Sequence, residues 1–378
     1  MKYRLGIYIP TLDIGGGQQV AVLLANQIAQ AYPHIEVVLF LFQKEATNYY
    51  IDPAVKVQSL GITVYHPNFL RRTSSFINKA VRLAPYLKNS ELRMDAIISI
   101  LFNSNTVLLA AKTLQPQTTT RLIVSEQTTI GNALPFSRKN YVRVSWLRRW
   151  FYPQATAIVA ASEGVAEELR GLSKKLKVQT IYNPLDLKTI DAQSKISLPD
   201  WVKFDYIVGV GRYHNQKGFD WLIQALVQLP EDIHLVLVGD GPERESLTQL
   251  AKTLNLQDRV HLVGFDTNPF RWMKRSRCFV LSSRYEGFGI VVAEALAVGV
   301  PVVSMNCPFG PEEILQQGKV GELVKLGDVD GMAAAIQRVL EADESENKVM
   351  RQQRAADFAV DKIAEAYLRL ALPEAINQ

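Results

Sequence analysis

The sequence predicts an α/β protein built from two Rossmann-like domains in tandem, and three observations support this class. Short apolar, β-branched runs alternate with amphipathic helical stretches along the chain, as expected for parallel sheets covered on both faces. This alternation stops at a polar, proline-containing segment, 183–205, and then starts again. The length of 378 residues, at about 150 residues per domain, also favours two domains.

The first half of the chain contains the strands and the opening loop of one such domain. A strand at 5–9 leads into a glycine loop at 15–17 and then into a helix at 18–30. Apolar residues recur along that helix at Val20, Leu23, Leu24 and Ile28. Apolar runs predict the remaining strands at 37–42, 95–101, 121–125 and 157–160.

The second half repeats the arrangement. Strands are expected at 206–210, 234–238, 260–263, 278–282 and 300–304, with helices at 219–229 and 243–254. We therefore expect an N-terminal domain at 1–184, a C-terminal domain at 185–355, and a helix at 356–378 that packs back toward the N-terminal domain. Ligands of such paired domains bind in a cleft between them.

The charge is divided unevenly between the halves. Residues 1–186 contain 21 Lys and Arg against 11 Asp and Glu, a net +10, and the remaining 21 and 26 give −5. The basic half suggests an anionic partner: nucleic acid, a membrane surface or a phosphorylated substrate. Two cysteines, Cys278 and Cys307, cannot form a disulfide framework or a structural zinc site. No uncharged apolar window of about 18 residues predicts a transmembrane helix, and the start, MKYRLGIYIP, is unlike a signal peptide.

Two loops of the second half contain residue types suited to an anionic, hydroxylated ligand. Arg212 and Lys217 lie between a strand and a helix, where two cations can meet one phosphate group beside a helix N-terminus. A solvated basic loop is the structural alternative. Glu286 precedes Gly287 and Gly289, and Glu294 interrupts an apolar helix. A carboxylate accepts well from vicinal hydroxyls, although Glu294 could equally pair with a buried arginine or a backbone amide.

The glycines at 15–17 follow the first strand but lack the spaced third glycine of a dinucleotide fingerprint. No acidic residue ends the strand at 37–42, where an NAD ribose would need one, so an NAD dehydrogenase is disfavoured. The glycines form either a tight turn or a phosphate-facing loop. A third segment, Arg138–Tyr152, interleaves five cations with aromatic residues. It predicts either contact with an anionic membrane or an amphipathic helix packed on the domain.

In order and spacing, these segments resemble glycosyltransferase family 4, the retaining, sugar-nucleotide-dependent transferases of GT-B fold. That fold has two Rossmann-like domains facing each other across a deep cleft. The matching segments are GGGQQ from Gly15, GRYHNQKG from Gly211, LVGDGPERESL from Leu237, VHLVGF from Val260, EGFGIVVAE from Glu286 and CPFGPEEIL from Cys307. The set covers roughly 205–345 and, in the first half, mainly the glycine loop.

The resemblance implies a role for each matching residue. Arg212 and Lys217 would bind the donor diphosphate and stabilise the leaving nucleotide, and Glu286 would hold hydroxyls of the donor sugar. Glu294 would bind the ribose hydroxyls, the turn Gly264–Phe265 would meet the base, and Gly16 and Gly17 would face the phosphates. The remaining expected donor contacts are Gly287, Phe288, Gly289 and Ile290. Relatives often have a histidine after the strand matching 121–125. This chain has Glu126 and Gln127 there, either of which could contact the sugar.

The implied activity is transfer of a sugar from a nucleotide sugar, a UDP-sugar being favoured, with retention by front-face attack and with neither metal nor cofactor. The implied acceptor is a glycan or a polyprenyl-diphosphate-linked glycan, in the synthesis of capsule, O-antigen or lipopolysaccharide. The protein would then lie in the cytoplasm or peripherally on the inner face of the cytoplasmic membrane, without nucleic acid as a partner. Two alternatives are a UDP-sugar epimerase or hydrolase of similar fold, and a non-catalytic nucleotide-sugar-binding protein.

Overall fold

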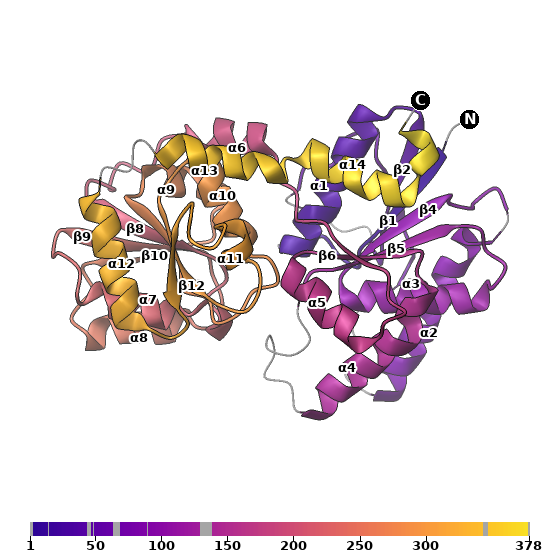
Figure 1. The fold of residues 1–378 in the computed structure, drawn as a ribbon, viewed down its shortest axis with the longest axis horizontal. Coiled ribbons are helices and arrows are strands. Elements are labelled where there is room, and N and C mark those ends of the chain that lie inside the picture. The colour runs from indigo at the N-terminus through magenta and orange to yellow at the C-terminus, as the bar shows by residue number, and fades with distance from the viewer. Residues whose placement is uncertain are drawn as a thin grey trace. The chain divides into compact units, whose positions relative to one another are not determined.

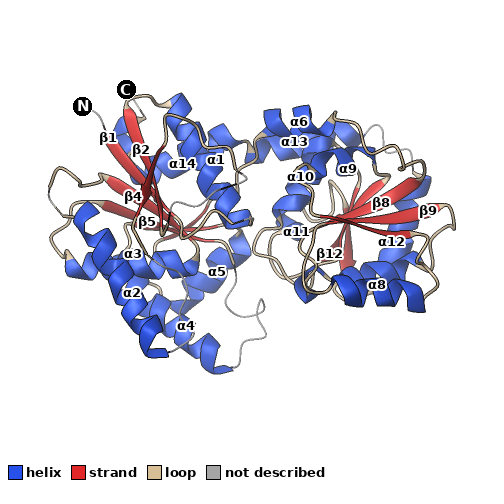
Figure 2. Cartoon of the chain, turned by 180° about the vertical axis from the view of Figure 1, so that it is seen from behind, coloured by secondary structure: helices blue, strands red, loops and turns tan. Residues whose placement is uncertain are grey.

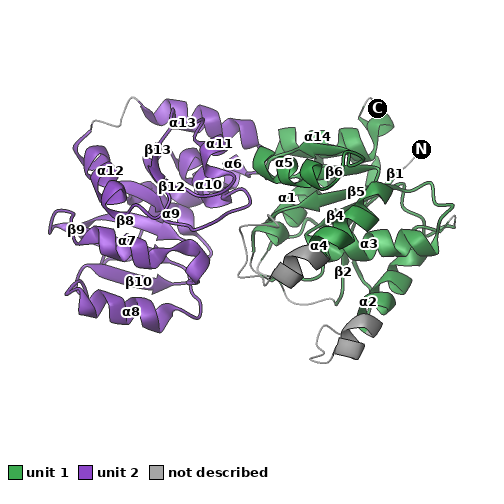
Figure 3. Ribbon diagram, turned by 60° about the horizontal axis from the view of Figure 1, so that its bottom comes forward, with its two compact units in different colours: residues 1–184, 360–378 green, residues 185–359 purple. Residues whose placement is uncertain are grey.

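The computed structural model describes residues 3–13, 15–43, 47, 49–62, 69–88, 90–128, 138–342 and 347–376, with 69–74 and 138–143 described by their backbone. The chain forms two compact units (Figures 1 and 3). Unit 1 comprises Met1–Pro184 and Val360–Gln378, and unit 2 comprises Leu185–Ala359. The chain thus passes from unit 1 to unit 2 after Pro184 and returns after Ala359.

The described residues of unit 1 form a seven-stranded parallel sheet in the order β3-β2-β1-β4-β5-β6-β7. Its strands are β1 (Tyr3–Tyr8), β2 (Ile35–Leu41), β3 (Lys56–Ser59), β4 (Ala96–Ile100), β5 (Arg121–Glu126), β6 (Ala157–Ala160) and β7 (Val178–Thr180). Its helices are α1 (Gly16–Ala31), α2 (Phe69–Leu83), α3 (Phe102–Leu114), α4 (Arg138–Phe151), α5 (Glu163–Leu172) and α14 (Val360–Ala371), with 3-10 turns at Ala84–Tyr86, Tyr152–Gln154 and Pro373–Ala375.

The described residues of unit 2 form a six-stranded parallel sheet in the order β10-β9-β8-β11-β12-β13. Its strands are β8 (Asp205–Val210), β9 (Ile233–Val238), β10 (Val260–Gly264), β11 (Cys278–Leu281), β12 (Val302–Asn306) and β13 (Glu322–Lys325). Its helices are α6 (Leu187–Ser194), α7 (Phe219–Leu226), α8 (Arg244–Thr253), α9 (Pro269–Arg275), α10 (Ile290–Val298), α11 (Pro311–Ile314), α12 (Val329–Glu341) and α13 (Asn347–Ala355), with 3-10 turns η3 (Asn215–Lys217) and η4 (Ala356–Phe358).

Helices cover both faces of each sheet (Figure 2). In unit 1, α1 packs with α14 on one face, and α2, α3 and α4 pack together on the other. In unit 2, α7 packs with α8 and α12, while α6, α9, α10 and α13 form the second layer. The central strands are therefore apolar on both sides, and every residue of β4 is buried. None of the described helices combines the length and apolarity that a membrane span needs.

The predicted strands correspond to β1, β2, β4, β5 and β6 in unit 1 and to β8–β12 in unit 2. The prediction missed three strands, β3, β7 and β13. All three are edge strands, and the fourth edge strand, β10, was predicted. The missed strands have three or four residues each, and several of these are exposed. An edge strand packs against fewer neighbours, so its sequence lacks the continuous apolar run by which the central strands were identified.

The C-terminal helix α14 completes the core of unit 1. Tyr367 and Leu368 are fully buried in that core, and the Tyr367 hydroxyl lies 2.8 Å from the Ser125 hydroxyl of β5. The Arg121 guanidinium donates to the Leu370 carbonyl at 3.1 and 3.0 Å. Where the chain crosses between units, Leu185 N–H donates to the Phe358 carbonyl at 2.8 Å, so the outgoing and returning segments are paired.

Replacing Leu368 with alanine should destabilise unit 1, because the side chain is fully buried and its loss leaves a cavity that costs about 2–5 kcal/mol. Hydrogen exchange should show lower protection of β4 and β5, with β8 and β11 unchanged. The control is Arg369→Ala on the same helix, whose side chain is 67% exposed and should change stability by less than about 0.5 kcal/mol. Equal effects of the two variants would contradict the packing of α14 in this core.

Candidate functional site

The strand order of each sheet reverses next to its first strand, between β1 and β4 in unit 1 and between β8 and β11 in unit 2. Ligands of open parallel sheets bind beyond the carboxyl ends of the strands at such a reversal, because the loops on either side diverge there. In unit 2 these loops are 211–218, after β8, and 282–289, after β11. They contain the predicted residues Arg212, Lys217 and Glu286.

The Lys217 and Glu286 side chains meet between the two loops. Lys217 Nζ donates to Glu286 Oε1 at 2.7 Å, and the side chains are 18% and 8% exposed. The Ser283 hydroxyl donates to the same oxygen, also at 2.7 Å. Glu286 Oε2 has no hydrogen-bond partner among the described residues. The pair is therefore held at one oxygen, which leaves a carboxylate oxygen and two ammonium hydrogens for a ligand.

Arg212 lies in the same loop with its side chain in solvent, and no hydrogen bond or ion pair joins it to a described residue. The backbone of this loop is tightly confined. A Cβ atom on Gly239 would lie 1.9 Å from the Gly211 carbonyl oxygen, and one on Gly241 would lie 2.4 Å from that of Tyr213. Because the loop after β9 lies against the loop after β8, the path that carries Arg212 and Lys217 is set by glycines in a different loop.

The loop after β11 ends at α10. Gly289 caps this helix with a φ of 84°, a left-handed conformation that favours glycine, and Ile290 is the first helical residue. Phe288 is buried and packs edge-on against Phe358 with ring centroids 5.4 Å apart. Glu294 lies one turn into α10 and is 4% exposed. The stretch Gly287–Ile290 thus presents backbone at a helix start, beside the Glu286 carboxylate.

The predicted base-binding turn lies at the end of β10. Gly264 has a φ of 84°, and Phe265 is 49% exposed. The turn is anchored by Asp266, whose Oδ2 accepts from the Trp272 indole N–H at 2.7 Å and from Arg271 Nη2 at 2.7 Å. Burial opposes the charge of Asp266, but hydrogen bonds from the Asn268 amide, Trp272 and Arg271 outweigh it and lower the pKa of this carboxyl.

In unit 1, Gly16 and Gly17 lie at the start of α1, beyond the carboxyl end of β1. A Cβ atom on Gly17 would lie 2.8 Å from Leu101 Cδ2, whereas one on Gly16 would meet no atom within 4 Å. Leu101 follows β4 with a φ of 77°, an unusual value for leucine. Position 17 therefore has no room for a side chain, because the loops at this strand-order reversal touch. Position 16 borders open space, as a ligand contact would require.

Glu126 does not offer an oxygen to a sugar in this structure, which corrects the expected sugar contact. The side chain is fully buried, and its carboxylate accepts from Arg148 Nε at 3.1 Å, from Arg148 Nη2 at 2.7 Å and from the Tyr152 hydroxyl. Burial lowers and Glu126 raises the pKa of Arg148, with a net upward shift. Gln127, 8% exposed, donates from Nε2 to the Ser125 hydroxyl at 3.0 Å.

The same ion pair removes Arg148 from the membrane contact predicted for Arg138–Tyr152, while the side chains of Arg138, Lys139 and Arg143 lie outside the described residues. Arg148 is only 2% exposed, because it neutralises Glu126 and lies over the Phe102 ring at 4.3 Å, so it cannot face a lipid surface. Arg149 is exposed, and its Nε donates to the Leu172 carbonyl at the end of α5. Among the side chains of α4 that the structure describes, the exposed apolar ones are Trp146 and Trp150, 58% and 64% exposed, with ring centroids stacked 5.9 Å apart.

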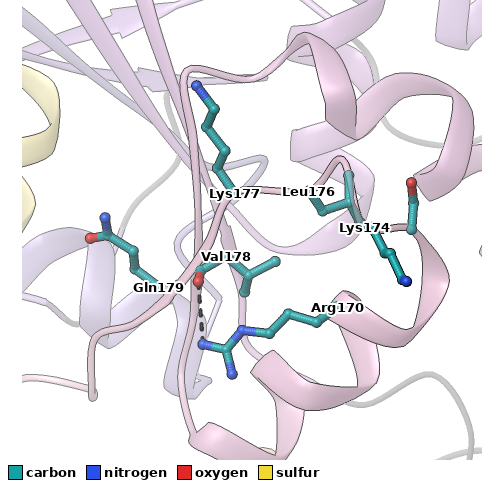
Figure 4. A pocket seen from close by; sticks show the side chains of 7 residues that line it. Arg170, Lys174, Leu176, Lys177, Val178 and Gln179 are labelled. Carbon is teal, nitrogen blue, oxygen red and sulfur yellow. Dashed lines mark hydrogen bonds between the residues drawn. The ribbon is translucent and has the colours of Figure 1, made fainter.

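A basic pocket of about 550 Å³ lies between the end of α5 and β7 (Figure 4). Its lining residues are Arg170, Ser173, Lys174, Leu176, Lys177, Val178 and Gln179. A connection from a helix to the next strand lies at the amino edge of a parallel sheet, opposite the ligand-binding loops. Within unit 1, this pocket therefore lies at the opposite edge of the sheet from Gly16 and Gly17.

Sequence reasoning missed the side chains that connect the two donor loops. Ser283 holds Glu286, and Arg284 forms a bidentate ion pair with Asp220 at 2.8 and 2.6 Å. These partners lie 64 positions apart in the chain, and neither position repeats a recognisable pattern. Within the ranges that the structure describes, no group of three or more His, Cys, Asp or Glu residues is arranged to hold a metal ion.

Comparison with known proteins identifies the family. Residues 14–189 match the family model described as glycosyltransferase family 4, and residues 195–356 match the model described as glycosyl transferases group 1. This chain belongs to glycosyltransferase family 4. The family 4 enzyme has the GT-B fold, as the two parallel-sheet units and the similar solved structures show.

Two curated relatives illustrate the match. The chain is 28% identical over 365 residues to the N-acetylgalactosamine-N,N'-diacetylbacillosaminyl-diphospho-undecaprenol 4-alpha-N-acetylgalactosaminyltransferase of Campylobacter jejuni, covering 95% of this chain and 96% of the relative. It is 31% identical over 225 residues to the lipopolysaccharide core biosynthesis glycosyltransferase LpsE of Rhizobium meliloti, covering 58% and 65%.

Solved structures share the fold over the whole length. The sucrose-phosphate synthase of Thermosynechococcus elongatus superposes with a TM-score of 0.82 at 21% identity, covering all of both chains. HepE of Anabaena, determined in complex with UDP, gives 0.74 at 21% identity, covering 97% of this chain and 98% of that one. The family models and the glycosyltransferase relatives, rather than the shared fold, show that the chain is a transferase.

Replacing Arg148 with alanine should destabilise unit 1 by about 3–5 kcal/mol, because it leaves the buried Glu126 carboxylate without its counter-ion. Urea unfolding followed by far-UV circular dichroism measures the loss. The control is the neighbouring Arg149→Ala, an exposed arginine whose removal should cost about 1 kcal/mol or less. If Arg148→Ala were as stable as Arg149→Ala, Glu126 would not depend on this ion pair.

Proposed function

We propose that this family 4 enzyme transfers a sugar from a nucleoside-diphosphate sugar, most readily a UDP-sugar, to a hydroxyl of a glycan or lipid-linked glycan during synthesis of a bacterial surface polysaccharide. The Campylobacter relative, which this chain matches over 95% of its length, acts by its name on a diphospho-undecaprenol-linked acceptor. The Anabaena neighbour binds UDP. Both names fit a protein whose donor unit presents cations beside a carboxylate.

The observation that carries the proposal is the Lys217–Glu286 pair at the strand-order reversal of unit 2. Lys217 and the exposed Arg212 supply positive charge for a diphosphate, and the second oxygen of Glu286 accepts from a sugar hydroxyl. Glycine at 287 and 289 lets the backbone N–H groups at the start of α10 approach the donor. Glu294, on the same helix, takes the ribose hydroxyls, and the Gly264–Phe265 turn meets the base.

In the proposed reaction, the bond between the sugar C1 and the diphosphate oxygen breaks, and its electron pair remains on the diphosphate. Lys217 and Arg212 stabilise this charge as it develops, which lowers the barrier because they are already in place. The acceptor oxygen bonds to C1 on the face that the diphosphate leaves, and its proton passes to the departing diphosphate oxygen. The anomeric configuration is therefore retained. The two cations replace a metal ion in neutralising the leaving group.

The proposed acceptor places the enzyme at the inner face of the cytoplasmic membrane. Of the predicted aromatic and basic segment, Trp146 and Trp150 are the exposed, stacked rings. Arg149 of α4 bonds to the end of α5, where the exposed Lys174, Lys175 and Lys177 follow. Indole rings suit the headgroup zone and lysines suit anionic lipid, so these residues form the proposed membrane surface.

Lys217→Ala should reduce transfer by about 10²-fold or more, because it removes a preorganised charge from the leaving group. The assay follows UDP release and glycan product from a panel of UDP-sugars with diphosphate-linked acceptors, with and without EDTA. Lys195→Ala is the control, since that lysine is 68% exposed and pairs within its own helix. We expect EDTA to have no effect and NMR to show a retained anomeric configuration.

Unchanged turnover of Lys217→Ala would remove the lysine from this role. Turnover of the UDP-sugar without any acceptor would favour an epimerase or hydrolase. Inversion at C1 would contradict the front-face step, and loss of activity in EDTA would contradict the metal-independent site.

Replacing Trp146 and Trp150 together by alanine should at least halve co-sedimentation with vesicles that contain an anionic lipid, because both rings lose their place in the headgroup zone. Tyr50→Ala, also in unit 1 and 68% exposed in the wild-type protein, is the matched control and should bind as wild type does. Equal binding by all three proteins would contradict the proposed membrane surface while leaving the transferase proposal intact.

A further inference from the structure

The two donor loops of unit 2 are joined by a single arginine that the proposed reaction does not use. Arg284, two positions before Glu286, donates from Nη1 to Asp220 Oδ1 at 2.8 Å and from Nη2 to Asp220 Oδ2 at 2.6 Å. Nη1 also donates to the Asn215 carbonyl at 2.8 Å, and the guanidinium lies 4.0 Å from the Trp221 ring centroid. One side chain thus contacts both the η3 turn of the Lys217 loop, at Asn215, and the following helix α7, at Asp220 and Trp221.

Further hydrogen bonds to backbone carbonyls, and one close backbone contact, join the two loops on both sides of Lys217. Arg284 N–H donates to the Gln216 carbonyl at 2.7 Å, and the Gln216 side chain donates to the Tyr285 carbonyl at 3.0 Å. The Ser282 hydroxyl donates to the Lys217 carbonyl at 2.8 Å. Gly218 lies so close that a Cβ atom there would be 2.1 Å from the Ser282 carbonyl oxygen.

The contacts between the two loops hold the backbone on either side of Lys217. Gln216 and the Lys217 carbonyl are hydrogen-bonded to the loop after β11, and Gly218 lies directly against it. Glu286 directly follows Arg284 and Tyr285, which take part in these bonds. The connection between the loops therefore fixes the backbone from which the two side chains extend, and Lys217 Nζ and Glu286 Oε1 meet at 2.7 Å.

The Arg284–Asp220 pair is suited to positioning rather than to stabilising the fold. Its side chains are 21% and 33% exposed, and an ion pair with that much solvent contributes little net free energy. Its bidentate form and the aromatic ring beneath it do fix an orientation. Asp220 and the Asn215 carbonyl take three of the five N–H hydrogens of Arg284, so the guanidinium group is held against the Lys217 loop.

We propose that Arg284, held by Asp220 and Trp221, is a positioning residue that sets the Lys217 ammonium group and the Glu286 carboxylate at the distance the donor requires. The inference rests on the proposed function of Lys217 and Glu286 in donor binding. It implies that an arginine is needed at 284, because a lysine cannot bond to both Asp220 oxygens while also reaching the Asn215 carbonyl and covering the ring.

The first test needs no substrate. Hydrogen exchange of the unliganded protein should show faster exchange at 216–218 and 284–286 in Arg284→Ala and Arg284→Lys than in wild type, with protection in β8 and β11 retained. Arg277→Ala is the matched control, an arginine of the same unit that pairs with Asp205 at the other edge of the sheet and should leave these loops unchanged. Wild-type exchange in both Arg284 variants would overturn the proposal, whether or not UDP-sugar transfer is found.

The second test is kinetic coupling. Arg284→Ala and Arg284→Lys should each lower kcat about tenfold or more, since a misplaced charge loses much of its effect. In a Lys217→Ala background, Arg284→Ala should lower kcat by clearly less than tenfold, because only the Glu286 carboxylate remains to be placed. Losses that multiply in the double variant, or wild-type kcat in Arg284→Lys, would overturn the positioning role. Absence of transfer by the wild-type enzyme would instead count against the proposed function.

Discussion

Both units depend on one constraint, the burial of a parallel sheet on its two faces. Each parallel strand must be reached by a crossover that returns to the same edge, usually through a helix, so the carboxyl ends and the loops that follow them lie along one edge. Residues far apart in the chain meet there because neighbouring strands end together. Lys217 follows β8 and Glu286 follows β11, strands that pair through Cys278 and Ile207, and this pairing brings their side chains to 2.7 Å.

Two ion pairs at the carboxyl edges illustrate different uses of the same chemistry. Glu126 and Arg148 are 0% and 2% exposed, and both carboxylate oxygens of Glu126 accept hydrogen bonds from Arg148 or Tyr152. A buried pair of this kind holds the fold together, because removing either charge leaves the other unsolvated. Lys217 and Glu286 are 18% and 8% exposed and share only one oxygen, so they keep hydrogen-bonding capacity for a ligand. The difference lies in how many partners surround each carboxylate.

The last residue of β5 shows how a sequence match can mislead. Glu126 occupies the place where relatives often have a histidine, and a polar residue there invites a role in sugar binding. In this chain the residue is turned into the domain by Arg148 and Tyr152, which arrive from a helix more than twenty positions later. Arg148 in turn leaves the basic surface to which the sequence assigned it. The two reassignments have one cause, since a charge buried in the domain requires its counter-charge to be buried with it.

The sequence by itself determined the fold class, most central strands and the residue types of the donor loops. Apolar periodicity, glycine at sharp turns and cations at strand ends are local properties that can be recognised in the sequence without knowing which segments meet. It also identified the family through motifs such as GRYHNQKG and EGFGIVVAE. Only the tertiary structure decided which charges are buried, which edge strands complete the sheets, and that Arg284 and Asp220 join the loops that hold Lys217 and Glu286. Those facts depend on contacts between segments about 20 to 250 positions apart, and such contacts exist only once parallel strands have aligned the loops at one edge.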